Sequence, residues 1–261
     1  MRVAIHQLAP EFGAPAANLA RIEAALRATP ADLWVLPELV TTGYDFADRA
    51  ELLRLAEPVP GPTTERLGRL CAERGLHVVV GLAERDGDAL YNTAAYLGPA
   101  GLVGRYRKVH LFDREARVFD PGPEPFRVYP LGEWRLGLMI CFDWIFPEAA
   151  RSLALQGADV IAHPSNLVLP YCHAAMVTRA LENGVFVATA NRVGTEDRAG
   201  RALTFTGGSR VIDPRGRVLA AAGTDTEETI DVAIDPAAAR DKMITAHNDR
   251  LADRRPDLYR L

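Results

Sequence analysis

The chain has 261 residues, of which 48% are hydrophobic and 25% are charged, and these fractions are typical of a folded globular protein rather than a disordered or fibrous one. Its formal net charge of -4 provides no positive field for nucleic acid or for an anionic membrane surface. We therefore expect neither as a partner, and we expect a small neutral or modestly polar ligand instead.

The cysteine content predicts a reducing environment. The chain contains 3 cysteines, Cys71, Cys141 and Cys172, and no C-x-x-C pair, which favours neither a disulfide framework nor a zinc site. The residues after Met1 are strand-like rather than signal-like, and no apolar run is long enough to span a membrane. We therefore expect the protein in the cytoplasm.

The first half of the sequence alternates strands with helices and then changes to a meander. Apolar periodicity predicts strands at 2–8 and 32–36 and helices at 15–28, 48–56 and 63–74. Strands at 77–84, 90–97 and 102–109 follow, separated by Asp86-Gly87 and by Pro99-Ala100-Gly101. We therefore expect part of the sheet to be antiparallel.

The second half predicts strands at 126–131, 134–140, 159–163, 185–190, 208–212, 218–222 and 228–234. Helices are expected at 147–156 and 173–183. This order favours an α/β protein whose mixed sheets carry helices on their faces. Because no linker or repeat interrupts the pattern, we expect a single domain over residues 1–261.

The last segment, residues 243–261, is charged but ends in the apolar residues Leu258, Tyr259 and Leu261. A disordered tail has no need of apolar side chains at its tip. We expect this segment to dock, either on the core of its own chain or on a second subunit.

Cys141 stands where a predicted strand gives way to a predicted helix. Pro147 is suited to the first position of a helix, and Glu148 complements the positive end of the helix dipole. A thiol just past a strand end, with unpaired backbone N–H groups nearby, is in a setting that favours thiolate and oxyanion. The alternative is an inert buried cysteine, and this is our interpretation of Cys71.

Three further ionisable residues are candidates for the same site. Glu38 follows the strand at 32–36, and the carboxyl ends of strands are where α/β sheets usually bind ligands, although a solvated loop carboxylate is the alternative. Lys108 and Glu115 lie in the stretch after the meander. We interpret Arg105 and Arg107, just before Lys108, as a solvated basic face.

Three stretches occur together in a definite order: Leu36-Pro37-Glu38, then Lys108-Val109-His110-Leu111, then Cys141-Phe142-Asp143 with Phe146-Pro147-Glu148. Each stretch is a weak signal alone. As an ordered set they closely resemble the nitrilase superfamily, the carbon–nitrogen hydrolases, and the resemblance covers essentially the whole chain.

The resemblance implies a four-layer αββα sandwich with mixed sheets and helices on the outer faces. It implies a catalytic triad of Glu38, Lys108 and Cys141, with Glu115 as a supporting second glutamate. It further implies a homodimer formed through the helices at 147–156 and 173–183, with the tail at 243–261 docking on the partner.

The chemistry of amide hydrolysis accounts for these residue types. An amide carbon is a poor electrophile, so the Cys141 thiol needs a base, Glu38, to remove its proton during attack. Lys108 and the backbone N–H of Phe142 are placed to stabilise the oxyanion before a thioester forms. We expect Glu115 to keep Lys108 charged. This chemistry requires no cofactor and no metal.

Three alternatives remain open. The first is a cysteine–histidine hydrolase with His110, His163 or His173 as the base for Cys141 or Cys172. The second is a non-catalytic binding protein on the same fold. The third is an aliphatic nitrilase. True nitrilases usually have Trp-Glu after the cysteine, whereas Phe142-Asp143 in this chain resembles the amidase and carbamoylase branches.

The candidate substrate-binding residues lie beside strand ends or in the nucleophile loop. They are Tyr44, Phe142, Trp144, Asn166, Leu167, Asn191 and Arg192. Packing in the wall of the site, without substrate contact, is the alternative interpretation, and for Trp144 and Leu167 the two are equally favoured.

Overall fold

Two six-stranded sheets make up the centre of the protein, for which a computed structural model describes residues 1–259. The first sheet has the strand order β14 (Glu228–Ala233), β1 (Arg2–Gln7), β2 (Leu33–Val35), β3 (His77–Asp86), β4 (Ala89–Gly98) and β5 (Gly101–Arg107). The second has the order β13 (Val218–Ala221), β12 (Arg210–Ile212), β9 (Phe186–Ala190), β8 (Val160–Pro164), β7 (Trp134–Leu138) and β6 (Val128–Leu131).

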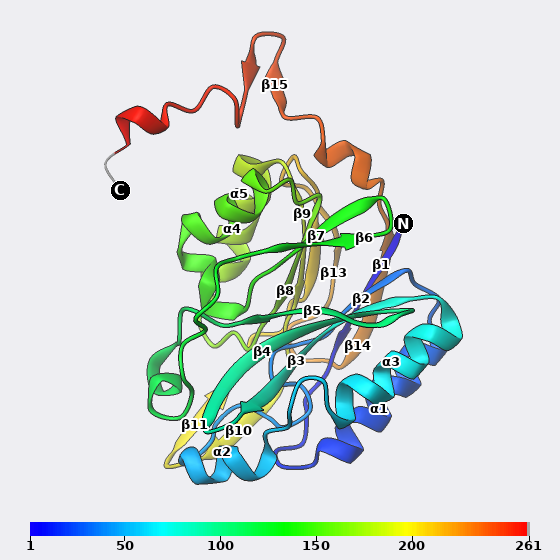
Figure 1. Cartoon of the computed structure of the whole chain (residues 1–261), viewed down its shortest axis with the longest axis vertical. Helices are drawn as coiled ribbons and strands as arrows, with labels where there is room; N and C mark the ends of the chain where they lie inside the picture. The colour runs from blue at the N-terminus through cyan, green and yellow to red at the C-terminus, as the bar shows by residue number, and fades with distance from the viewer. Residues whose placement is uncertain (260–261) are drawn as a thin grey trace.

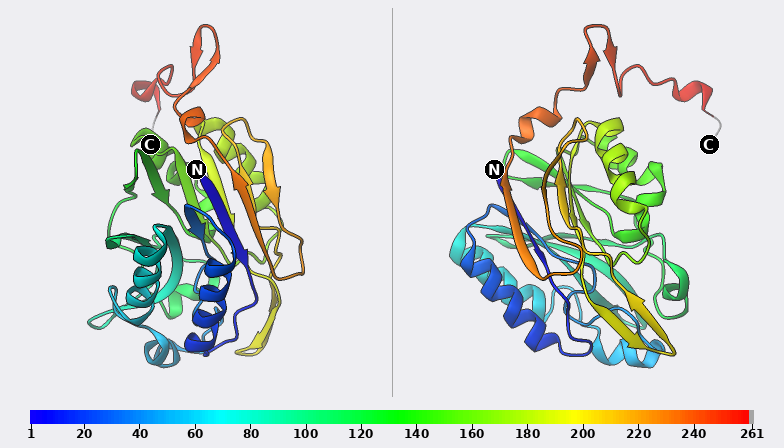
Figure 2. Two further views of the ribbon diagram at one scale, coloured as in Figure 1. Left: turned by 90° about the vertical axis from the view of Figure 1, so that its right-hand side faces the viewer. Right: turned by 180° about the vertical axis from the view of Figure 1, so that it is seen from behind.

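Helices cover the outer face of each sheet (Figures 1 and 2). Helices α1 (Pro15–Ala28) and α3 (Pro62–Arg74) lie on the first sheet, and α4 (Pro147–Leu155) and α5 (Cys172–Asn183) lie on the second. A short helix, α2 (Arg49–Leu55), packs near β3. The four-layer αββα sandwich expected from the sequence is therefore confirmed.

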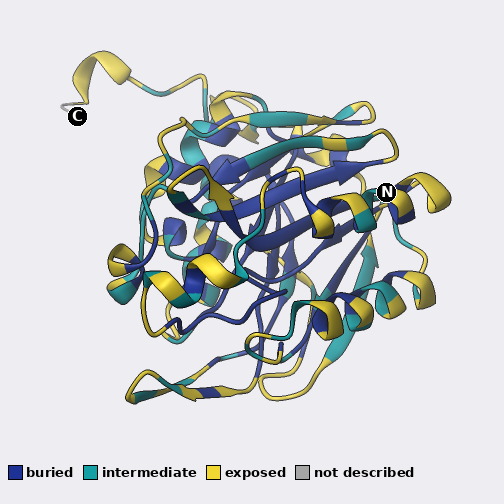
Figure 3. Cartoon of the chain, turned by 60° about the horizontal axis from the view of Figure 1, so that its bottom comes forward, coloured by how far each residue is buried: buried dark blue, intermediate teal, exposed yellow. Residues whose placement is uncertain are grey.

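The first sheet is buried on both faces. The hydrophobic core therefore has an outer part beneath the helices of this sheet and an inner part between the two sheets. The apolar stripe of α1, with Leu19, Ile22 and Leu26, packs on Trp34 of β2. A second cluster fills the space between the sheets and extends beneath α4 and α5. Figure 3 shows the central strands of the two sheets as the most buried part of the molecule, and the edge strands as more exposed. Burial on both faces explains why the central strands are continuous apolar runs rather than alternating ones.

The parallel strands at the centre of each sheet end on one side of the sandwich. β1, β2 and β3 are parallel neighbours in the first sheet, as are β7, β8 and β9 in the second. Loops that leave β2, β7, β8 and β9 at their carboxyl ends therefore approach one another between the two sheets. In α/β proteins this is the edge where functional side chains gather.

The prediction that Arg107 belongs to a solvated basic face is wrong. Its side chain is only 5% exposed, and its guanidinium donates to Glu84 Oε1 at 2.5 Å and to Asp86 Oδ2 at 2.7 Å. Arg105 is half-buried and contacts the same Glu84 carboxylate at 2.8 Å. The buried Glu84 requires these partners, because a carboxylate taken out of water is costly unless it is paired.

Two hairpins were not predicted. The first joins β10 (Thr195–Arg198) to β11 (Arg201–Thr204), and the second joins β15 (Met243–Thr245) to β16 (Asn248–Asp249). Short single-turn helices also occur: η1 (Asp113–Arg117), η2 (Cys141–Ile145), η3 (Pro236–Ala239) and η4 (Pro256–Leu258). Across residues 1–259, we find no helix with the length and apolarity required to span a membrane.

The C-terminal segment projects from the body of the molecule (Figure 1), and Arg250 ties its start to the body by donating to the carbonyls of Leu181 at 2.6 Å and Pro214 at 3.0 Å. Leu258 is 65% exposed and Tyr259 is 49% exposed, whereas Leu261 lies outside the described residues. Leu258 and Tyr259 therefore do not dock on the core of their own chain.

Candidate active site

The residues predicted to form the site lie just after strands of the two facing sheets. Glu38 follows β2 and Lys108 directly follows β5 in the first sheet, and Cys141 follows β7 in the second. The Glu38 loop lies against β3 at Gly81, where a Cβ would come within 2.4 Å of the Glu38 Cα, so a glycine is needed for this approach. The site is therefore built between the sheets.

Lys108 is fully buried between two carboxylates. Its Nζ donates to Glu38 Oε1 at 2.7 Å and to Glu115 Oε1 at 2.8 Å. Glu115 comes from η1, and its Oε2 accepts the backbone N–H of Phe112 at 3.1 Å. Asn92, from the middle of β4, donates to the same Glu38 oxygen at 2.7 Å. Sequence reasoning missed Asn92, because nothing marks an asparagine within a strand as part of a site.

Burial and the neighbouring carboxylates shift the pKa of Lys108 in opposite directions. Burial alone lowers the pKa of a lysine, because it disfavours the ammonium form. Here the carboxylates of Glu115 and Glu38 outweigh burial, and the pKa of Lys108 is raised. Burial raises the pKa of Glu115, and the charge of Lys108 opposes that rise. Lys108 is therefore a permanent cation at the centre of the site.

Cys141 lies in a strained turn at the end of its strand. It has φ 39, which is in the left-handed region that residues with a Cβ rarely adopt. Two buried side chains hold the turn: Asp143 Oδ2 accepts the Ile140 N–H at 2.8 Å, and His163 Nε2 is 2.9 Å from the Cys141 carbonyl oxygen. The turn continues as η2, so α4 begins at Pro147 and not directly after the cysteine.

The surroundings of Cys141 favour the protonated form of its thiol. Burial raises its pKa well above the ordinary value, the Glu38 carboxylate adds to this, and Lys108 lowers the pKa only in part. The backbone N–H of Asn166 also stabilises the thiolate to a small degree. A thiol in this state needs a base when it attacks, in contrast to the preformed thiolate of an electropositive site.

Tyr44 and Asn166 complete the surroundings of the ionic cluster. The Tyr44 hydroxyl donates to Glu115 Oε1 at 2.8 Å, and burial raises the pKa of this phenol. Asn166 Nδ2 donates to the Glu38 carbonyl at 3.0 Å. Two acceptors in this area, Glu38 Oε2 and Asn166 Oδ1, are buried and have no hydrogen-bond partner among residues 1–259.

A small cavity, with an enclosed volume of only about 10 Å³, opens beside Cys141. Its wall includes Phe142, Trp144, Asn166 and Leu167, four of the residues predicted to bind substrate. Trp144 is 8% exposed and Leu167 is 3% exposed, so both also pack within the core. The two interpretations offered for these side chains are therefore compatible.

Asn191 and Arg192 are not among the residues that line this cavity. Asn191 Oδ1 accepts the Leu167 N–H at 2.9 Å, and Asn191 Nδ2 donates to the Gly207 carbonyl at 2.7 Å. Arg192 is 1% exposed, pairs with Glu196 and lies over the ring of Phe205. Their polar groups bind other residues of the protein. No contact therefore supports the prediction that Asn191 and Arg192 bind substrate.

Glu196, in the unpredicted β10–β11 hairpin, supports the loop that carries Tyr44. Its carboxylate accepts the backbone N–H groups of Tyr44 at 3.2 Å and Asp45 at 2.8 Å. The buried Arg192 holds this carboxylate from the other side. Glu196 and Arg192 therefore affect the site by holding the backbone at Tyr44 in position, and no sequence motif indicates this role.

None of the three histidines considered as a base has a hydrogen bond to the Cys141 thiol among the described contacts. His163 Nε2 contacts the Cys141 carbonyl oxygen, and burial lowers the pKa of His163 to about 4. His110 Nδ1 contacts Asp143 Oδ1 at 2.7 Å. Burial lowers the pKa of His173 to about 4, and its ring nitrogens have no partner within residues 1–259. These contacts do not support a cysteine–histidine dyad.

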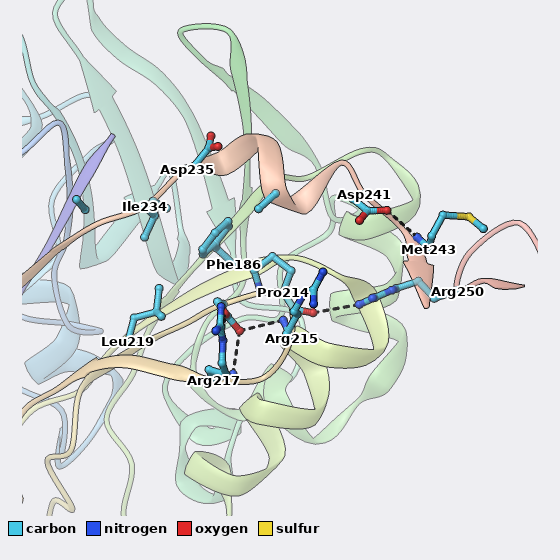
Figure 4. A pocket seen from close by; sticks show the side chains of 13 residues that line it. Phe186, Pro214, Arg215, Arg217, Leu219, Ile234, Asp235, Asp241, Met243 and Arg250 are labelled. Atoms are coloured by element: carbon cyan, nitrogen blue, oxygen red, sulfur yellow. Dashed lines mark hydrogen bonds and ion pairs between the residues drawn. The ribbon is translucent and has the colours of Figure 1, made fainter. Parts of the chain in front are cut away.

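A larger cavity of about 250 Å³ lies at the opposite end of the second sheet (Figure 4). Phe186, the first residue of β9, lines it, whereas the loops of the candidate site follow the last residues of the strands. Its polar side chains are paired locally, as in the contact of Arg217 with Asp213 at 2.7 Å. Size alone therefore does not identify the functional cavity. No group of three or more potential metal ligands is found within residues 1–259.

Comparison with known proteins identifies the family. The family model described as carbon-nitrogen hydrolase matches residues 2–242. A nitrilase of Pyrococcus abyssi is 47% identical over 99% of this chain and 99% of its own length. An (R)-stereoselective amidase of a Pseudomonas species is 37% identical over 98% of this chain and 92% of its own length.

The solved structure of the Nit3 protein of Saccharomyces cerevisiae, a member of branch 10 of the nitrilase superfamily, is also similar. It has a TM-score of 0.80 and 29% sequence identity, with 92% of each chain covered. The chain belongs to the carbon–nitrogen hydrolase family of the nitrilase superfamily. It is accordingly a hydrolase of carbon–nitrogen bonds other than peptide bonds.

The contact between Glu115 and Lys108 leads to the first testable prediction. Glu115→Gln removes a negative charge that raises the pKa of Lys108, so the charged form of Lys108 is less favoured while the side chain at 115 keeps its shape. We expect turnover to fall by about 10²-fold or more, with an unchanged circular-dichroism spectrum. Glu65→Gln, at an exposed carboxylate on α3, is the matched control. Near-normal turnover of Glu115→Gln would show that the second carboxylate is dispensable.

Proposed function

We propose that this protein hydrolyses the carbon–nitrogen bond of a small aliphatic amide or N-carbamoyl compound, with release of ammonia, through a thioester on Cys141. The observation that carries the proposal is the buried Lys108 ammonium between Glu38 and Glu115, next to a protonated thiol. These groups supply a nucleophile, a base and a fixed positive charge in a space without bulk water. The mechanism needs neither a metal nor a cofactor.

The first half of the reaction forms the thioester. Glu38 takes the thiol proton as Cys141 Sγ attacks the amide carbon, and the carbonyl oxygen gains a negative charge that Lys108 and the Phe142 N–H stabilise. General-base help of this kind contributes typically about 10²–10⁴-fold. Glu38 then gives the proton to the nitrogen, the carbon–nitrogen bond breaks, and ammonia leaves.

The second half returns the enzyme to its starting state. Glu38 removes a proton from a water molecule, and the resulting hydroxide attacks the thioester carbon. The carbon–sulfur bond breaks, and the thiolate regains a proton from Glu38. An amide substrate gives a carboxylic acid, whereas an N-carbamoyl compound gives a carbamic acid that loses CO2 to leave the amine. The same carboxylate therefore serves as base and acid in both halves, as general acid–base catalysis requires.

The unpartnered acceptors favour an amide over a nitrile. Glu38 Oε2 and Asn166 Oδ1 are buried near Cys141 without donors among the described residues. Buried acceptors are costly unless they receive a hydrogen bond. The NH2 group of an amide or carbamoyl compound offers two such donors, whereas a nitrile offers none.

Nitrile hydrolysis is the second candidate function. The relative at 47% identity is named a nitrilase, and a nitrile carbon can be attacked by the same thiol. Phe142-Asp143 after the nucleophile argues for the amidase side. A binding protein without catalysis is disfavoured, because all the residues of the proposed triad are present and close together.

Ammonia release tests the proposed function. Purified protein is incubated with matched short aliphatic amides, N-carbamoyl amines and nitriles, and we expect release from amides or carbamoyl compounds but not from nitriles. Cys141→Ala is expected to be inactive because it lacks the nucleophile. Cys71→Ala, at a buried cysteine in α3, is expected to retain activity.

Release of ammonia from nitriles alone would assign the protein to the nitrilase side. Silence on all three substrate types would contradict the proposed activity and favour the binding-protein interpretation. Activity that survives Cys141→Ala would contradict the thioester mechanism itself.

The protein is further proposed to form a homodimer through α4, α5 and the C-terminal tail. Large apolar side chains are exposed on this side of the chain, including Leu155 at 49%, Leu181 at 49% and Tyr171 at 63%. The projecting tail adds Ile244 at 65% and Leu258 at 65%. Contiguous exposed apolar surface of this kind marks an interaction site in soluble proteins.

Deletion of residues 250–261 tests the role of the tail. We expect the oligomer of the truncated chain to dissociate at a higher protein concentration than the oligomer of the full-length chain, because apolar contacts with the partner are lost. Static light scattering over a dilution series measures the mass. The exposed Leu102, away from this surface, gives the control variant Leu102→Ser. Identical dilution curves for the truncated and full-length chains would rule out a role of the tail between subunits.

A further inference from the structure

The wall of the cavity beside Cys141 is apolar. Three segments supply it: the loop before η1, the nucleophile turn η2 and the loop after β8. Its apolar side chains are Phe112, Phe142, Trp144, Leu167, Val168 and Leu169. Leu169 is 40% exposed and stands at the solvent side, whereas Leu167 is 3% exposed. The wall therefore extends from solvent to the buried thiol.

The aromatic part of this wall is held in place by ring contacts. The centroids of Phe112 and Phe142 are 5.1 Å apart, and Phe142 makes an edge contact with Phe146 at 5.5 Å. Such aromatic pairs favour fixed relative orientations. The apolar surface is thus largely formed before a substrate arrives.

Polar groups occur only at the inner end of the cavity. Besides the six apolar side chains, its described lining consists of Cys141 and Asn166. The charged side chains next to this wall have partners within the protein. Arg179 donates to the Trp144 carbonyl at 3.2 Å and pairs with Glu182 at 2.9 Å, and Asp143 accepts from the Tyr106 hydroxyl at 2.8 Å. They are therefore not free to meet a charged group of a substrate at Cys141.

We propose that this apolar wall binds the acyl side chain of the substrate and selects small, uncharged amides with an apolar acyl group over amides that carry a carboxylate or ammonium group. The proposal rests on the proposed function, because it concerns the same Cys141 site. A charged acyl group would lose its hydration in this cavity without gaining a partner, which is unfavourable. An apolar chain instead leaves water for an apolar surface.

Steady-state kinetics with a matched series of amides test the proposal. The series is acetamide, propionamide, butyramide and valeramide, with succinamate as the charged partner of butyramide. We expect kcat/KM to rise by about fourfold for each methylene group that the wall covers. We expect succinamate to be at least about tenfold poorer than butyramide.

A charge placed on the wall provides the matched variant. Leu169→Arg puts a cation at the solvent side of the cavity, and we expect it to improve kcat/KM for succinamate relative to butyramide by on the order of tenfold. Leu53→Arg, at a leucine of α2 that is 45% exposed and outside the cavity, is expected to leave the ratio unchanged. Circular dichroism checks that both variants are folded.

The outcomes separate this proposal from the proposed function. Hydrolysis of every amide without a preference for apolar acyl groups, or a preference of the wild-type protein for succinamate, would overturn the apolar-wall proposal while the amidase activity stands. If Leu169→Arg leaves the ratio of kcat/KM for succinamate and butyramide unchanged, the acyl group does not bind at this wall. Absence of ammonia from all amides would instead count against the proposed function.

Discussion

The site depends on one buried cation, Lys108, held between two carboxylates. If Glu38 and Glu115 were not there, burial would remove the proton from Lys108, and if Lys108 were not there, two carboxylates would face each other in a dry space. Burial, and then the Glu38 carboxylate, raise the pKa of the Cys141 thiol, and Lys108 opposes this rise. The protonated form of the thiol is therefore favoured next to this cluster.

The αββα architecture is what makes such a cluster possible. Each sheet is covered on its outer face by helices, so the space between the sheets is dry, and parallel central strands bring their carboxyl ends to the same side of it. Glu38 and Lys108 come from one sheet and Cys141 comes from the other. Because the two sheets are packed against each other over a continuous core, the distance between Glu38 and Cys141 is fixed by the whole sandwich rather than by one loop.

Much of the element order was predictable from apolar periodicity, and the helices at Pro15 and Pro147 begin at the prolines that mark them. The sandwich and the catalytic set came from the ordered motifs instead. The β10–β11 hairpin was missed because its strands are short and largely polar. The burial of Arg107 and Arg192 was missed because arginine is usually exposed, and their partners Glu84 and Glu196 are revealed only by the tertiary structure. Asn92 and His163 likewise act through contacts that no spacing indicates.

The state of the Cys141 thiol is the most direct test of this account. The ultraviolet absorbance of thiolate is measured during a pH titration of the wild-type protein, and the titration of Cys141→Ala is subtracted from it. The account predicts no thiolate signal from Cys141 at neutral pH, because burial and Glu38 raise its pKa above that of an ordinary cysteine. A thiolate signal at neutral pH would contradict it, and would indicate a preformed ion pair in place of a thiol that loses its proton to Glu38 during attack.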